Sequence, residues 1–244
     1  PEKNACTQTA AQSAGGSNFA QCSNNSGGSD PSNDITSITQ NNDATGTHVD
    51  DIFQDNTASL SMVMTLGNDC DATTFTDSGD NNAECSNDDA ENFINAVDQS
   101  NDATGNDDVL IDQDNILDVS QALTANSDCD STAQNNALCE SDFANSFIDT
   151  ITQDNTATGD DFAQILQGND ATFAQNIGLL NSCDESGAGI IDPDASCQND
   201  QNENFIGLVA QSNTAADAAE IDTVTQSNIM DVTQDLSATN DCNE

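Results

Sequence analysis

The residues of this sequence best suited to specific chemistry are glutamines and asparagines, which recur two positions apart as Gln-x-Asn. The stretch ITQDNTATGDDFAQILQGNDATFAQ, residues 151–175, contains this pattern twice. An amide side chain both donates and accepts hydrogen bonds, so copies of one amide held at the roughly 4.8 Å spacing of adjacent strands can bond in a ladder. The pattern therefore predicts a hydrogen-bonded network between stacked strands. Its expected members are Gln40, Asn42, Gln54, Asn56, Gln99, Asn101, Gln113, Asn115, Gln153, Asn155, Gln167, Asn169, Gln211, Asn213, Gln226 and Asn228.

A spacing of two residues is the period of a β-strand, whose successive side chains point to opposite faces. From Ile151 to Ala157, one face carries an aliphatic residue, two amides and an alanine, while the other face carries Thr and Asp. Low hydrophobicity combined with high net charge is typical of disorder, but a disordered tract has no reason to keep a strict alternation. The alternation therefore favours an ordered, all-β chain.

The alternating strands belong to a longer repeat, found in residues 38–70, 97–129, 151–183 and 209–242. The first glutamine of each copy lies 54 to 59 residues from the next one, and Gly, Asn and Asp supply a turn between a first and a longer second strand. A buried amide without a partner costs about 1–3 kcal/mol, and stacking of the copies removes that cost. The sequence predicts an all-β repeat protein, a β-solenoid of stacked β-arch rungs with disulfide-bearing loops.

The expected organisation is an N-terminal segment followed by four modules. The segment is rich in Gly, Ser and Asn, which indicates a linker or a subunit contact. Phe and Ile precede each of the last three modules, and core packing is the simplest interpretation of these phenylalanines. The expected boundaries are 1–33 for the segment and 34–84, 85–138, 139–196 and 197–244 for the modules.

The stretches ITQDNTATG, ILQGNDATFAQ, VAQSNTAAD and VTQSNIMDVTQ resemble the repeats of the curlin family, which are the secreted subunits of functional amyloid fibres. Repeats of that family form two-stranded rungs stacked into a fibre, although they are shorter, usually carry glycine between Gln and Asn, and lack cysteine. The resemblance covers about half of the chain. Amide-rich repeats combined with cysteines and acidity are also similar to the amyloid-like sheath proteins of archaea. The resemblance implies a subunit that polymerises by strand stacking.

The nine cysteines lack the spacings of zinc, haem or redox motifs, so we expect disulfides and an oxidising, extracellular setting. Two pairing schemes fit the repeat, and each leaves one thiol for a bond between chains. Shorter loops close more readily, which favours the first scheme. The schemes are Cys6–Cys22, Cys70–Cys85, Cys129–Cys139 and Cys183–Cys197 with Cys242 unpaired, or Cys22–Cys70, Cys85–Cys129, Cys139–Cys183 and Cys197–Cys242 with Cys6 unpaired.

Acidic residues cluster around the cysteines as Asp-x-Asp pairs, whose oxygens are ligands that calcium prefers. No EF-hand loop accompanies them, so a solvated acidic surface is the simpler interpretation. We expect no cofactor, with Ca²⁺ as the alternative. A single sequon, NNS at Asn24, is the candidate glycosylation site. The candidate metal ligands are Asp69, Asp71, Asp128, Asp130, Asp192 and Asp194.

The formal net charge is −43, from 44 acidic residues and a single Lys or Arg. Without a basic patch the chain cannot bind nucleic acid or an anionic membrane surface. No apolar run approaches the roughly 18–20 residues of a membrane span. His48 is the only histidine and Lys3 the only lysine, and neither has a catalytic motif around it, so we expect no enzyme.

The leading hypothesis is a secreted structural subunit that assembles with itself into an amyloid-like extracellular filament or sheath at the cell surface, in adhesion or a biofilm matrix. We also expect that a leader was removed before Pro1. One alternative is a calcium-binding adhesin or surface-layer β-solenoid. Another is a donor-strand pilin, in which the N-terminal segment completes the sheet of a neighbour.

Overall fold

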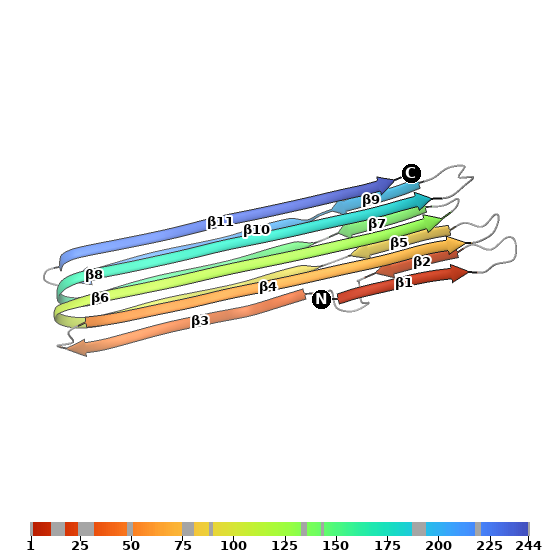
Figure 1. Cartoon of the computed structure of the whole chain (residues 1–244). Helices are drawn as coiled ribbons and strands as arrows, with labels where there is room; N and C mark the ends of the chain where they lie inside the picture. The colour runs from red at the N-terminus through yellow and green to blue at the C-terminus, as the bar shows by residue number, and fades with distance from the viewer. Residues whose placement is uncertain are drawn as a thin grey trace.

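The computed structural model is all-β, as the alternation predicts, and the eleven strands of its described part pair in parallel. Figure 1 shows long strands lying side by side, with the short strands gathered near the end where β4, β6, β8 and β11 finish. The structure describes residues 2–10, 18–23, 32–47, 51–74, 81–87, 90–132, 136–142, 144–186, 194–217 and 221–243.

The strands form two sheets, and equivalent residues of successive modules pair in register. The larger sheet holds β1 (Glu2–Ala10), β3 (Ser32–Thr47), β4 (Asp51–Thr74), β6 (Glu91–Thr132), β8 (Asn145–Ser186), β10 (Glu203–Asp217) and β11 (Ile221–Asn243). The smaller sheet holds β2 (Asn18–Ser23), β5 (Asn81–Asn87), β7 (Asn136–Asp142) and β9 (Asp194–Asp200).

Each module consists of two arms that face each other. The first arms are β3, residues 91–106 of β6, residues 145–160 of β8, and β10; the second arms are β4, residues 109–132 of β6, residues 162–186 of β8, and β11. First arms pair with first arms and second arms with second arms, while the two arms of one module meet through side chains. Asn101 Nδ2, for example, donates to Asn115 Oδ1 at 3.1 Å. The sheet bonds therefore run between modules, which is the arrangement that an amide ladder requires.

Between the arms, apolar layers alternate with amide layers. Ile111 and Ile165 form an apolar cluster near the bend between the arms. Phe173 belongs to a central cluster, and Leu123 to a third one near the cysteines. Gln113 is fully buried and lies in an amide layer between the first two clusters. The interior is thus apolar enough to exclude water and polar enough to need internal hydrogen-bond partners.

The alternation is interrupted once in each first arm, which changes the position of the phenylalanines. Ile94 and Val97 are both fully buried although they are three residues apart. Phe93 precedes the buried Ile94 by one residue and therefore points to the outer side. There it is 6.5 Å from the ring of Phe147, which is 5.5 Å from that of Phe205. The predicted core packing of these module-start phenylalanines is wrong, because they form a column on the outer face.

The N-terminal segment 1–33, interpreted above as a linker or subunit contact, contributes β1 and β2, which pair with β4 and β5. The expected module boundaries at residues 85, 139 and 197 fall on the cysteines of β5, β7 and β9. Within the described residues, no helix is long and apolar enough to cross a membrane.

Candidate functional site

The predicted glutamines lie in two continuous ladders whose bonds all point the same way. In one ladder, Nε2 of Gln99 donates to Oε1 of Gln40 at 2.8 Å, and Nε2 of Gln153 donates to Oε1 of Gln99 at 2.9 Å. Gln211 continues it with a 2.8 Å bond to Gln153. The second ladder joins Gln54, Gln113, Gln167 and Gln226 in the same direction over 2.7 to 2.9 Å. Each glutamine therefore donates toward the N-terminal end of the stack.

The predicted asparagines form a double ladder that runs in the opposite direction. Nδ2 of Asn101 donates to Oδ1 of Asn155 at 3.0 Å in the next module, and to Oδ1 of Asn115 in the facing arm at 3.1 Å. Nδ2 of Asn115 donates back to Asn155 at 3.0 Å. Each of these second arms therefore lies between the first arm of its own module and the first arm of the next module. The full double ladder contains Asn42, Asn56, Asn101, Asn115, Asn155, Asn169, Asn213 and Asn228.

The ladder amides are also bonded to the backbone of the facing arm. Nε2 of Gln99 donates to Ile116 O at 3.0 Å, and Nε2 of Gln113 donates to Thr156 O at 3.1 Å. Gln99, Gln113 and Asn115 are at most 1% exposed. These bonds satisfy polar groups that would otherwise destabilise the interior.

Several further polar residues join the network. Gln175 donates to Gln121 at 2.8 Å and Gln234 to Gln175 at 2.6 Å, and Met62 takes the place of the first glutamine in that column. Asn33 donates to Asn92 at 2.9 Å. The sequence signals for these columns are found in the last three modules. They are the glutamine eight residues after the second Gln-x-Asn and the polar residue before Phe-Ile.

One column is incomplete. Ser146 pairs in register with Asn92 and Asn204, but its side chain is too short to continue an amide ladder. The buried Oγ of Ser146 and Oδ1 of Asn204 have no hydrogen-bond partner among the described residues. A serine at this position therefore weakens the network locally.

The cysteines form two columns in register. One column is Cys6, Cys70, Cys129, Cys183 and Cys242, and the other is Cys22, Cys85, Cys139 and Cys197. Cys197 is bonded to Cys242 with a Cα–Cα distance of 6.3 Å, as in the second pairing scheme, so the loop-closing pair Cys183–Cys197 is absent. Cys85 is also in a disulfide. Cys129, Cys139 and Cys183, expected to be paired, are buried free thiols.

The three free thiols form a compact cluster whose sulfurs all lie within 4.8 Å of one another. Hydrogen bonds from Cys129 and Cys139 lower the pKa of Cys183, whereas contacts with the other two thiols, together with burial, raise the pKa of Cys129. The Sγ of Cys183 is also 3.1 Å from the Sγ of Cys197, in the neighbouring disulfide. A sulfur set of this kind suits a soft metal such as Cu(I) or zinc rather than calcium.

The predicted acidic ligands flank the cysteine columns. Asp128 is exposed beside the buried Cys129. Asp69 and Asp71 lie in β4, Asp130 in β6 and Asp194 at the start of β9. Within the described residues, the only groups of three close ligand atoms are made of cysteine sulfurs. Asp192, Asn24 and His48 lie outside the described residues.

Stacking in register also aligns carboxylates, and Asp114→Asn is expected to stabilise the fold. Asp114 pairs with Asp55 and lies two residues from Asp112. Burial first, then the charges of Asp112 and Asp55, raise the pKa of Asp114 above its ordinary value of 3.8. The ionised group therefore destabilises the folded state at pH 7, and this penalty falls as the pH drops through the raised pKa toward 3.8.

We expect the variant to gain about 0.2–1 kcal/mol at pH 7, the range for like charges on adjacent strands. Denaturant unfolding at pH 7 and at acidic pH would show the gain shrinking as the pH falls. Asp118→Asn is the matched control, because Asp118 is exposed and pairs with Ser59 and Thr172. An equal gain in the control would assign the effect to net charge instead.

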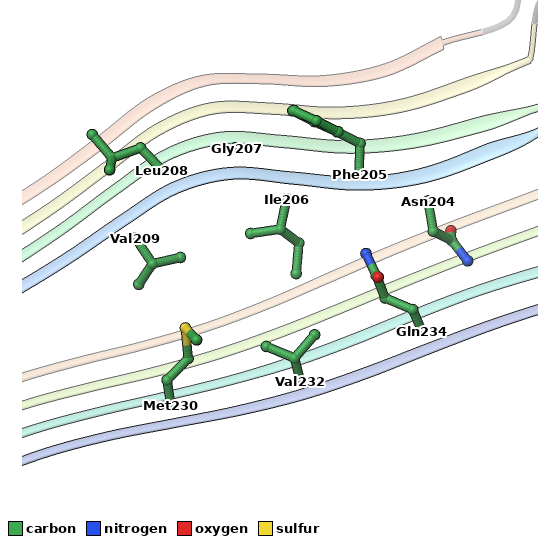
Figure 2. Close-up of a pocket in the computed structure, with 9 residues that line it drawn as sticks. All are labelled: Asn204, Phe205, Ile206, Gly207, Leu208, Val209, Met230, Val232 and Gln234. Atoms are coloured by element: carbon green, nitrogen blue, oxygen red, sulfur yellow. The ribbon is translucent and has the colours of Figure 1, made fainter.

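The C-terminal end of the stack is open. A groove of about 470 Å³ separates β10 from β11 and is lined by Ile206, Val209, Met230, Val232 and Gln234, among others. Figure 2 shows the Met230, Val232 and Gln234 side chains projecting from β11 toward the arm that carries Ile206 and Val209. Val232 is 40% exposed, whereas Phe173, its register partner in the second arm of β8, is 1% exposed.

The openness of this end follows from the staggered arms. Interior second arms lie between two first arms, but β11 contacts the first arm β10 and lacks a second one beyond it. Among the described residues, none donates to Oε1 of Gln211 or Gln226.

A comparison with protein-family models, curated proteins and solved structures finds no match to this chain.

Proposed function

We propose that this protein is a secreted, non-enzymatic structural subunit, a β-solenoid that binds further copies of itself. The copies stack head to tail by β-strand pairing into an amyloid-like extracellular filament or sheath. The observation that carries the proposal is the direction of the amide ladders, which leaves complementary groups at the two ends of the chain. Neither nucleic acid nor membrane insertion has a part in this role.

At the C-terminal end, the glutamine ladders finish in acceptors, the Oε1 atoms of Gln211 and Gln226. At the N-terminal end they start with donors, because within the described part of the chain Nε2 of Gln40 and Gln54 bonds only to backbone carbonyls, Thr57 O at 3.0 Å and Asp102 O at 2.9 Å. A second copy stacked in the same direction continues both ladders. Two copies stacked end against like end would place acceptor against acceptor.

The asparagine ladder supports the same direction. Nδ2 of Asn213 and Asn228 faces the open end, where each lacks the next-module acceptor that Asn155 and Asn169 have. Oδ1 of Asn42, in the first arm β3, is the matching acceptor of an incoming copy. Each copy would therefore both donate and accept hydrogen bonds across the interface, and this fixes the orientation of the subunits.

The shape of the two ends is also complementary. β11 lacks a covering first arm, and β3 is a first arm without a second arm on its outer side. Docking β3 of one copy over β11 of another would cover Met230 and Val232, which are 54% and 40% exposed. Burial of apolar side chains in a close-fitting groove is the main source of affinity in such a contact.

Electron microscopy and fibre diffraction of the purified protein at low and high salt test the proposal. We expect filaments or sheets with a reflection near 4.8 Å along the long axis. Assembly should improve with salt, because the screening length falls from about 10 Å at 0.1 M to about 3 Å at 1 M and the subunits are strongly acidic. Dispersed monomers at every salt concentration, refolding only with calcium, would instead favour the adhesin.

A further inference from the structure

The proposed filament makes no use of the cluster formed by Cys129, Cys139 and Cys183. These thiols are 0% exposed, yet one of them touches a disulfide: the Sγ atoms of Cys183 and Cys197 are 3.1 Å apart, while Cys197 is bonded to Cys242. A thiol in contact with a disulfide sulfur is the arrangement from which thiol–disulfide exchange proceeds.

The stagger of the two cysteine columns explains this contact. Cys139 Sγ donates to Ser182 O at 3.2 Å, next to Cys183, and Cys183 Sγ donates to Ser196 O at 3.5 Å, next to Cys197. A sulfur of one column thus lies within reach of two sulfurs of the other. For Cys197, the two candidates are Cys183, 14 residues away, and Cys242, 45 residues away.

We propose that Cys183 and the Cys197–Cys242 disulfide form an internal exchange site, which moves a free thiol from the interior to the open end of the stack. The thiolate of Cys183 attacks Sγ of Cys197. A Cys183–Cys197 bond forms, the Cys197–Cys242 bond breaks, and Cys242 leaves as a thiolate that takes up the proton lost by Cys183. One disulfide and one thiol are present before and after, so no external oxidant or reductant is needed.

The surroundings favour this step. The thiolate is the form that attacks a disulfide, and the Sγ of Cys183 already lies 3.1 Å from the Sγ of Cys197 that it would attack. Burial keeps external thiols and alkylating reagents away from Cys183, whereas Cys242 lies half-buried on β11 at the open end. The exchange therefore converts a protected thiol into one that can react with molecules outside the chain.

The test uses the full-length protein at a dilution where it is monomeric, so its result does not depend on self-assembly. The protein is incubated at neutral pH with a chelator and no added thiol, and samples are alkylated over time. Digestion at acidic residues then separates the cysteines, and mass spectrometry identifies the labelled and the paired ones. We expect the label on Cys242 to increase together with a Cys183–Cys197 peptide.

Three variants make the test specific. Cys183→Ser should abolish labelling of Cys242 and leave Cys197–Cys242 as the only pair of this region. Cys242→Ser should give only Cys183–Cys197. Cys129→Ser is the control, because it removes a neighbouring buried thiol but keeps the attacking one, and it should retain exchange. Persistence of Cys197–Cys242 alone in the wild-type protein, or equal labelling of Cys242 in the Cys183→Ser variant, would overturn the proposal.

Discussion

Replacing Asn115 with leucine is expected to lower the free energy of unfolding by about 2–6 kcal/mol, because the four hydrogen bonds that one amide side chain can make, worth roughly 0.5–1.5 kcal/mol each, are lost. Asn115 is 0% exposed and lies in the middle of the double ladder. The two N–H groups of its side chain are shared among Asp154 O, Asn155 Oδ1 and Asn169 Oδ1, and its Oδ1 accepts from Asn56 and Asn101.

Denaturant unfolding followed by circular dichroism would measure this loss. Ile116→Leu is the matched control, because it introduces the same side chain at the next position, which is 44% exposed. The control should unfold within about 0.5 kcal/mol of the wild type, as surface substitutions usually do. If Asn115→Leu behaved like the control, the ladder would make no net contribution to stability.

Asn115→Asp separates the hydrogen bonds from the shape of the side chain. An ionised aspartate keeps the size of asparagine but donates no hydrogen bond, and burial raises its folded pKa above the unfolded value of about 3.9. The destabilisation should therefore be greatest at neutral pH and should decrease as the pH falls through the folded pKa. A destabilisation independent of pH would show that the carboxylate is not buried.

Val232→Asp is expected to raise the protein concentration needed for assembly by at least about 100-fold. In the proposed contact, β3 of the incoming copy buries this side chain, and an unpaired buried charge costs several kcal/mol, of which each 1.4 kcal/mol is tenfold in affinity. Val232 is 40% exposed in the single chain, so its own fold should be little changed. Sedimentation across a concentration series would measure assembly, and denaturant unfolding would measure the fold.

The control for this variant is Thr233→Asp, one residue further along β11. Thr233 pairs with the exposed Ala174, which places it on the outer face of the strand. It adds the same charge outside the proposed contact and should assemble at nearly the wild-type concentration. Assembly of Val232→Asp at the wild-type concentration would exclude the β11 groove as the contact surface, and failure of both variants would point to net charge.

The amide positions and the all-β fold could be predicted because a ladder imposes a strict sequence requirement. Gln99 and Asn101 must share one face of a strand, and each must recur at the matching position of the next module. The stagger of the arms could not be predicted from the sequence. The sequence pattern is the same whether a second arm faces one first arm or lies between two. The interruption of the alternation between Ile94 and Val97 could not be predicted either, and because of it Phe93 lies on the outer face.

The disulfide pairing could not be predicted for a geometric reason. Loop length favoured pairing Cys183 with Cys197, but stacking brings Cys242 as close to Cys197 as its near neighbour in sequence. In a stacked chain, sequence separation no longer measures distance, because residues one module apart are neighbours in a sheet. The thiol cluster is a product of the same geometry and had no separate sequence signal.

The short strand β1 has a consequence for the rate at which the proposed filament would grow. β1 pairs with β4 from Leu66 to Thr74, and the C-terminal part of β11, from Ala238, holds the equivalent position in the last module. When two copies meet in register, β1 of one and the end of β11 of the other therefore compete for a single place beside Leu66. In the proposed filament, one of these strands would have to be displaced before two copies could join, so each added subunit would cross an activation barrier that the modules within one chain do not meet.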